Sequence, residues 1–197
     1  IVGGDHSVPL GYIKALLEKY QEFGVLHIDA HMDLRNKYEG FHFSHASIFN
    51  NILKEEGITK LVQVGIRDYC EEELKKVKEE QGRGTVFYEQ LIRENHFEGM
   101  TWNEQCSRII EELPGDVYVS LDVDGLDPKL CPHSGTPVPG GLDYFELVFL
   151  FKKLVGSGRR IIGFDLCETG NNEWDGNVGA RILYKLCNLT GRSRGLI

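Results

Sequence analysis

The chain has 197 residues, a formal net charge of -8, 41% hydrophobic residues and 26% charged residues, and these values suit one globular domain with a sizeable core. It contains no cluster of basic residues typical of nucleic-acid binding, no segment long enough to cross a membrane and no signal-peptide pattern, so we expect neither nucleic acid nor a membrane as a partner. The five cysteines are scattered and none lies in a CxxC pair, which favours reduced thiols in the cytoplasm.

In chain order, apolar periodicity and turn residues predict a regular alternation of helices and strands. Pro9 is typical of a helix start, Gly57 and Gly82 are typical helix ends, and residues 143–146 form a capping-box pattern. The predicted helices cover 9–20, 47–56, 71–81, 103–113, 144 to at least 155, and 178–189. The predicted strands cover 24–31, 60–68, 85–89 and 159–168, and residues 116–127 are predicted to begin as a strand and to run into a polar loop.

The predicted strands are apolar on both faces, which is typical of a parallel sheet covered by helices on each side. The fold class that this predicts is α/β, with a mainly parallel sheet. No repeat, linker or low-complexity segment interrupts residues 1–197, so we expect one domain. The chain starts at Ile1 rather than at a methionine, and we expect the N-terminal part of this domain to be missing.

Polar side chains follow several predicted strands at the point where each strand ends. Asp29, His31 and Asp33 in "HIDAHMD" are two residues apart and would lean to the same side of an extended chain. The other such side chains are Asp122 and Asp124 in "SLDVDGLDP", Glu168 in "DLCETG", and His6 in "GGDHS" just before the first helix. In parallel sheets the chemistry lies beyond the carboxyl ends of the strands, so we expect these groups to share one rim.

Four of these side chains are aspartates, and burying them together is costly unless cations bind them. Two like charges about 4 Å apart repel by roughly 4 kcal/mol at an effective dielectric of about 20. One divalent ion would leave excess negative charge, whereas two would balance four carboxylates. Oxygen-rich ligands with two imidazoles favour Mn²⁺ or Mg²⁺ over a structural zinc, which prefers thiolates. The sequence therefore predicts a two-ion metal centre.

Four motifs, "GGDHS", "DAHMD", "SLDVDGLDP" and "SGTPVPGG", occur in an order that resembles the arginase/agmatinase ureohydrolases. The resemblance extends from Gly3 to the last predicted helix. It implies the arginase-like three-layer α/β/α fold, two Mn²⁺ ions per chain and a homo-oligomer, either a trimer or a hexamer. By resemblance, one ion would be held by His6, Asp29, Asp33 and Asp122, and the other by Asp29, His31, Asp122 and Asp124.

The resemblance also implies hydrolysis of a guanidinium group to urea and an amine by an activated hydroxide. Asp33 would take a proton from the hydroxide, and Glu168 would pair with the substrate guanidinium. His45 in "FHFSHAS" would protonate the leaving amine, with the nearby His42 as its rival. His27 is expected to point away from Asp29, as a core or supporting residue.

The resemblance favours a small cationic guanidino substrate, with agmatine, cleaved to putrescine and urea, as the first choice. "HFSHAS" and "VGIRD" are closer to agmatinases than to arginases. Arginase, guanidinobutyrase and formimidoylglutamase stay open as alternatives, because Arg35 could meet an acidic substrate tail.

Two other classes stay open. A deacetylase-type amidohydrolase has a similar fold but holds a single zinc ion, and His31 and Asp124 argue against it. A non-catalytic metal-binding relative is the second, and the complete ligand set argues against it. A metal content of two ions per chain would favour the hydrolase.

Overall fold

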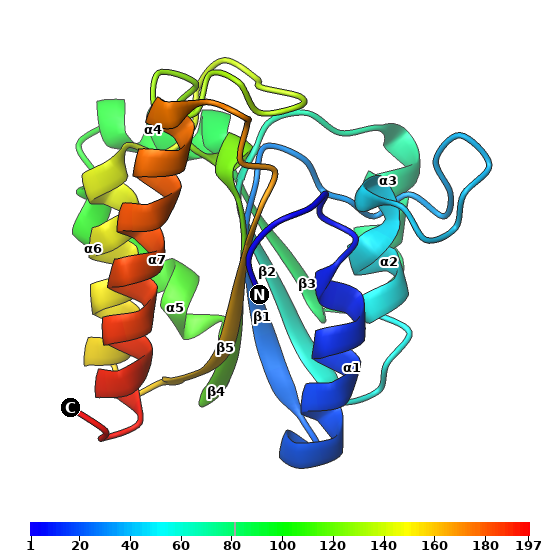
Figure 1. Cartoon of the computed structure of the whole chain (residues 1–197), viewed down its shortest axis with the longest axis horizontal. Coiled ribbons are helices and arrows are strands. Elements are labelled where there is room, and N and C mark those ends of the chain that lie inside the picture. The colour runs from blue at the N-terminus through cyan, green and yellow to red at the C-terminus, as the bar shows by residue number, and fades with distance from the viewer. Residues whose placement is uncertain (81) are drawn as a thin grey trace.

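A five-stranded sheet lies at the centre of the computed structural model, which describes residues 1–80 and 82–197 (Figure 1). The strands are β1 (Phe23–Ile28), β2 (Ile58–Ile66), β3 (Gly84–Tyr88), β4 (Asp116–Asp122) and β5 (Arg160–Cys167). Their order is β3-β2-β1-β4-β5, and all neighbouring strands are parallel. The predicted parallel sheet is confirmed, and all carboxyl ends lie at one edge of it.

Helices cover both faces of this sheet, which confirms the three-layer α/β/α fold (Figure 1). They are α1 (Pro9–Tyr20), α2 (Ile48–Ile52), α3 (Glu71–Glu79), α4 (Glu89–Phe97), α5 (Trp102–Glu111), α6 (Tyr144–Gly156) and α7 (Glu173–Ser193), with 3₁₀ turns η1 (His45–Ser47) and η2 (Val123–Gly125). Val25 of β1 belongs to the core beneath α1 and α2, whereas its neighbour Leu26 belongs to the core beneath α5, α6 and α7. Successive strand residues thus face opposite layers.

The predicted elements differ from the structure mainly at their ends. The helix α4 was not expected, because only Glu89 and Ile92 of it are buried and no apolar stripe marks it. The helix α2 is shorter than predicted, because it ends at Ile52 and residues 53–57 form turns. The helix α7 starts earlier than predicted, where Asn172 accepts a hydrogen bond from the Trp174 backbone. The predicted capping box of α6 is confirmed. The helix predicted over 71–81 includes Gln81, which lies outside the described residues.

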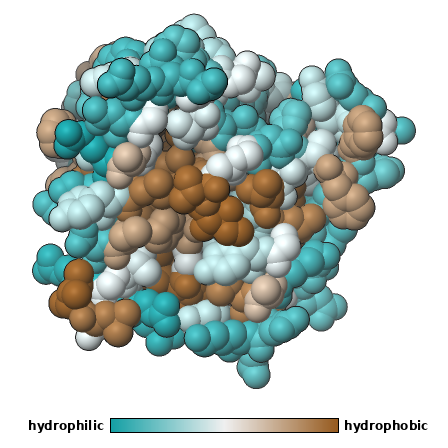
Figure 2. Space-filling model, in the orientation of Figure 1, coloured by the Kyte–Doolittle hydropathy of each residue, from teal (hydrophilic) through white to brown (hydrophobic). Residues whose placement is uncertain are grey.

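The first residues of the chain lie along the edge strand β5. Val2 pairs in parallel with Leu166, and the amino group of Ile1 donates to the Phe164 carbonyl at 2.9 Å. Figure 2 shows hydrophobic residues gathered in this part of the surface, between α1 and α7. The pairing with β5 places the segment that carries His6 at the carboxyl end of the sheet. Among the described residues, no helix is both long enough and apolar enough to cross a membrane.

Candidate metal centre

The carboxyl ends of β1, β4 and β5 meet at one rim because these neighbouring strands run in the same direction. One of the predicted ligands ends β4, one lies in the turn η2 that follows it, three follow β1, and one comes from the segment before α1. The structure brings together all six side chains, namely His6, Asp29, His31, Asp33, Asp122 and Asp124. They come from three segments far apart in the sequence, around residues 6, 29–33 and 122–124, and the sheet topology makes these segments neighbours.

Three carboxylates surround one nitrogen of His6. Its Nδ1 lies 3.1 Å from Asp29 Oδ2 and 3.4 Å from Asp33 Oδ2. The distance from the same nitrogen to Asp122 Oδ2 is also 3.4 Å. A single N–H group cannot satisfy three charged acceptors, so this position suits a multivalent cation better than a proton.

A second group of donors forms around His31. Its Nδ1 lies 3.1 Å from Asp124 Oδ2 and 3.4 Å from Asp29 Oδ1. Asp29 therefore faces His6 with one carboxylate oxygen and His31 with the other. An aspartate in this position can serve two adjacent metal ions, one on each oxygen.

Burial and mutual repulsion disfavour negative charge at this centre. Burial, followed by the charge of Asp29, raises the pKa of Asp33 to about 7. Burial would lower the pKa of His31, but its hydrogen bonds to Asp124 and Asp29 raise that pKa to about 11. Without cations, the centre must therefore hold protons at neutral pH. Divalent cations can replace those protons, and the carboxylate-rich donor set fits them.

A buried relay fixes the ring of His6. Its Nε2 lies 2.8 Å from the Ser120 hydroxyl, which donates its own hydrogen to Asp165 Oδ2 at 2.8 Å. Because the hydroxyl has one hydrogen, it must accept from the Nε2–H group of His6. In the neutral ring this leaves the lone pair of Nδ1 facing the carboxylates. Burial raises the pKa of the neighbouring Cys167 thiol, so Cys167 stays a neutral donor to Asp165.

The prediction that His27 points away from Asp29 is wrong. Residues 27 and 29 share one side of the strand because the side-chain period is two. His27 Nδ1 lies 2.9 Å from the amide nitrogen of Gln63, which can only donate, so His27 Nε2–H donates to Asp29 Oδ2 at 2.8 Å. Burial lowers the pKa of His27 to about 4, which keeps the ring neutral. His27 thus orients Asp29.

Two acidic residues of the site adopt left-handed backbone angles. Asp33 has φ +54° and Glu168 has φ +63°, in a region that residues other than glycine rarely adopt. Such conformations cost of the order of 1–3 kcal/mol each. The Glu168 backbone is held by a bond from its N–H to Gly4, and its carboxylate accepts from the His6 backbone at 2.9 Å. Strained positions of this kind concentrate at functional sites.

A cavity of about 170 Å³ opens beside the predicted ligands, and its walls include His45, Glu168 and Arg35. The structure therefore places both further predicted residues, His45 and Glu168, beside the six donors. His42 lies outside this wall, is exposed, and donates from Nδ1 to the Asn36 carbonyl at 3.0 Å.

Several residues that support the six donors were not predicted from the sequence. The guanidinium of Arg67 donates to the backbone carbonyls of Asp124, at 2.6 Å, and Val138, at 2.9 Å, and so fixes the loop that follows β4. Thr136 from this loop donates to Asp124 Oδ2 at 3.2 Å. Arg67 follows the end of β2, and Ser120 precedes Asp122 by two residues. The strand-end rule and the two-residue period could have identified both.

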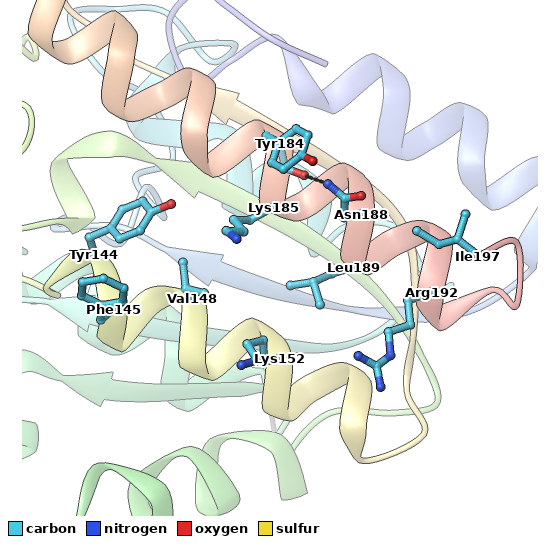
Figure 3. A pocket seen from close by; sticks show the side chains of 10 residues that line it. All are labelled: Tyr144, Phe145, Val148, Lys152, Tyr184, Lys185, Asn188, Leu189, Arg192 and Ile197. Atoms are coloured by element: carbon cyan, nitrogen blue, oxygen red, sulfur yellow. Dashed lines mark hydrogen bonds between the residues drawn. The ribbon is translucent and has the colours of Figure 1, made fainter.

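A larger cavity, of about 780 Å³, lies between α6 and α7, and none of the six donor side chains lines it (Figure 3). Its apolar part includes Val148 and Leu189, and its charged groups are Lys152, Lys185 and Arg192. No aspartate or glutamate lies among the described residues that line it. It offers none of the ligand chemistry found at the rim of the sheet.

Comparisons with known proteins agree with this geometry. Residues 1–186 match the family described as the Arginase family. The chain is 37% identical over 196 residues to an N(1)-aminopropylagmatine ureohydrolase of Thermus thermophilus, covering 98% of this chain and 63% of that protein. It is 30% identical over 207 residues to guanidinobutyrase of Pseudomonas aeruginosa, covering 96% of this chain and 60% of that protein.

The structure is similar to that of proclavaminate amidino hydrolase from Streptomyces clavuligerus. The TM-score is 0.82 at 27% identity, covering 98% of this chain and 63% of that one. The chain therefore spans 60–63% of the length of these three proteins. All three carry names of enzymes that act on guanidino or amidino groups, with different substrate tails.

Proposed function

The chain belongs to the arginase family, and on this premise we propose that it hydrolyses the guanidino group of a small substrate to urea and an amine. The proposal depends above all on one observation, the convergence of the six donor side chains, four of which line one cavity together with Glu168. The same arrangement suits a cationic guanidinium, because carboxylates dominate the cavity wall.

Two Mn²⁺ ions per chain would complete the centre. One would be held by His6, Asp29, Asp33 and Asp122, and the other by Asp29, His31, Asp122 and Asp124. The total charge of two divalent ions balances that of the four aspartates, so the buried carboxylates can stay ionised. When bound, such a pair of ions lowers the pKa of water to near neutrality and supplies a hydroxide nucleophile.

Glu168 would hold the guanidinium group. Its carboxylate is half-buried, and the bond from the His6 backbone fixes one of its oxygens close to the ligands. Burial raises the pKa of Glu168, and a bound guanidinium would favour its ionised form. Paired N–H donors of a guanidinium match two carboxylate oxygens, so the planar carbon would be presented in one orientation.

Asp33 and His45 would handle the protons. The Asp33 carboxylate would accept the proton that is lost when the nucleophile adds to the guanidinium carbon. The C–N bond to the substrate tail breaks readily only when that nitrogen is protonated. A ring nitrogen of His45 would supply this proton, since histidine gains and loses protons near neutral pH. Urea and a protonated amine would leave.

Agmatine is the first candidate substrate, and putrescine the corresponding amine. The motifs "HFSHAS" and "VGIRD" support an agmatinase-like branch. The similarity to an aminopropylagmatine ureohydrolase supports a tail that ends in amines. Asp68 lines the same cavity and is exposed enough to meet a cationic tail.

Guanidinobutyrate is the second candidate, and Arg35 favours it. Among the described residues, the Arg35 guanidinium has no carboxylate within 4.0 Å, although it lies on the wall of an acidic cavity. An unpaired cation there could bind the carboxylate of a substrate tail. The similarity to a guanidinobutyrase supports this alternative.

Product release from a panel of substrates tests the proposal. The chain, loaded with Mn²⁺, is incubated with agmatine, arginine, guanidinobutyrate and formimidoylglutamate, and urea or, for the last compound, formamide is measured. We expect urea from agmatine and a metal content of two ions per chain. No product from any of the four compounds, or a single zinc ion per chain, would contradict the proposal.

We also propose that the protein works in the cytoplasm as a homo-oligomer, a trimer or a hexamer. All five cysteines are free, as expected in a reducing compartment. Size measurement by light scattering tests the assembly.

A further inference from the structure

We propose that Tyr38 is a positioning residue that holds the imidazole of His45 in the orientation needed for proton transfer. This inference rests on the role of proton donor proposed above for His45. Tyr38 lies on the wall of the same cavity as His45 and Glu168. It has no part in the metal centre.

His45 needs an external support because hydrogen bonds do not orient it. Within residues 1–80 and 82–197, neither ring nitrogen of His45 has a hydrogen-bond partner. Both nitrogens of His6 and of His27 are engaged by neighbouring side chains. The nitrogens of His45 thus remain available to a substrate, and the orientation of its ring must come from packing.

The ring of Tyr38 provides this packing. Its centroid lies 5.3 Å from that of His45, with 70° between the ring planes. This edge-to-face arrangement is a preferred geometry for aromatic pairs. It fixes the plane of the imidazole without occupying either nitrogen, which is what a ring that must give up a proton requires.

A tight backbone turn fixes the position of Tyr38. The backbone N–H of Tyr38 donates to Phe41 at 2.9 Å, and that of Phe41 donates to Tyr38 at 2.8 Å. The two residues between them, Glu39 with φ +49° and Gly40 with φ +90°, both have positive φ, as two-residue hairpin turns of type I′ require. The turn therefore has a defined conformation rather than a loose one.

Further contacts tie this turn to the body of the protein. The Arg35 backbone donates to Ala46 at 3.0 Å, and Asn51 of α2 donates to the His42 carbonyl at 2.7 Å. The guanidinium carbon of Arg35 lies 5.6 Å from the centre of the Tyr38 ring, within range of a cation–π contact. Tyr38 is thus held from its backbone and from one ring face while it contacts His45.

Two substitutions at this position separate the ring from the hydroxyl. Tyr38→Leu removes the aromatic contact, and Tyr38→Phe retains it. We expect Tyr38→Leu to lower kcat about tenfold, the size that one aromatic contact permits, with KM changed less than about twofold. Tyr38→Phe should restore kcat to near the wild-type value. Phe43→Leu is the matched control, since Phe43 belongs to the same loop and is 74% exposed.

The second readout does not depend on activity. In protein labelled with ¹³C-histidine, the ring resonance of His45, assigned by its loss in His45→Gln, reports the neighbouring aromatic ring. We expect Tyr38→Leu to shift it, and Tyr38→Phe and Phe43→Leu to leave it in place. Thermal midpoints of the variants show whether each one is folded.

The outcomes are distinguishable. An unchanged His45 resonance and an unchanged kcat in folded Tyr38→Leu would overturn the proposal. A raised KM with unchanged kcat would also overturn it, because Tyr38 would then act on the substrate. A wild-type chain that turns over no substrate would contradict the proposed function instead, while the resonance would still test the contact between the two rings.

Discussion

The two cavities of this protein differ in almost every respect. The one between α6 and α7 is large, about 780 Å³, and combines an apolar floor with lysine and arginine side chains (Figure 3). The one at the carboxyl rim of the sheet is about 170 Å³ and is surrounded by buried carboxylates and imidazoles. Size would point to the first as the functional site, and chemistry points to the second.

The difference lies in the free energy needed to maintain each cavity. The surface between α6 and α7 leaves its cationic groups exposed to water, so it requires no compensating partner. The rim buries carboxylates, fixes histidine tautomers through Ser120 and Gln63, and holds Asp33 and Glu168 in strained conformations. A protein retains such unfavourable features only where they serve a purpose. Substitutions should therefore affect the two regions very differently.

The largest effect should come from the end of β4. Asp122→Asn removes one carboxylate from the metal centre, and we expect kcat/KM for the proposed reaction to fall at least about a thousandfold, since each ion contributes several kcal/mol. Metal content should fall below two ions per chain. Urea release and elemental analysis measure the two quantities.

The opposite end of the same strand offers a matched control. Asp116 forms an ion pair with Arg160 at 2.6 Å near the protein surface, and exposed pairs contribute only about 0–1 kcal/mol. Asp116→Asn should keep both metal ions and nearly full activity. Equal losses of metal and activity in the two variants would contradict the placement of the metal centre at the carboxyl end of β4.

The second effect should distinguish the two neighbouring histidines. His45→Ala should lower kcat about a hundredfold, as is typical for the loss of a general acid. His42→Ala should change kcat less than about twofold, because His42 lies outside the cavity wall and bonds to the Asn36 carbonyl. Steady-state kinetics on both variants test this. A larger loss in His42→Ala would reverse the assignment.

The third effect concerns pH. The raised pKa of His31, about 11, means that the metal-free centre holds a proton there at neutral pH. Binding of Mn²⁺ must displace it, so affinity should rise by about tenfold per pH unit for each proton released. Titration calorimetry in buffers of different ionisation enthalpy measures the number of protons. An affinity independent of pH would show that the centre binds without losing protons.

The sequence predicted the fold and the gathering of polar groups at one rim, because both follow from strand direction and apolar patterning. Helix α4 was missed, since burial of Ile92 alone gives no periodic signal. The orientation of His27 was predicted wrongly although the two-residue period was available. The Tyr38–His45 contact could not be predicted, because it depends on how a turn outside any regular element folds back onto the cavity.

The fourth effect should be smaller, because Ser120 is not one of the six donors but hydrogen-bonds to one of them, His6. Ser120→Ala removes the group that accepts from His6 Nε2–H and leaves Asp165 without that partner. Losses of such supporting bonds typically lower metal affinity about 10- to 100-fold, and we expect the lower end, since Nδ1 remains free to bind. Competition with a chelator of known affinity measures it. Ser120→Thr, which keeps the hydroxyl, should restore much of the affinity.

The smallest effect should come from the larger cavity. Lys185→Ala and Leu189→Ala alter the charge and the apolar floor between α6 and α7, and neither residue contacts any of the six donors. We expect metal content to stay at two ions per chain and kcat/KM to change less than about twofold, as is usual for surface changes away from a site. Lys185 is exposed whereas Leu189 is partly buried, so Lys185→Ala is the variant less prone to destabilise the fold. A tenfold loss of kcat/KM with unchanged metal content would mean that this cavity is coupled to the rim, and that the cost of maintaining a cavity is a poor guide to where function lies.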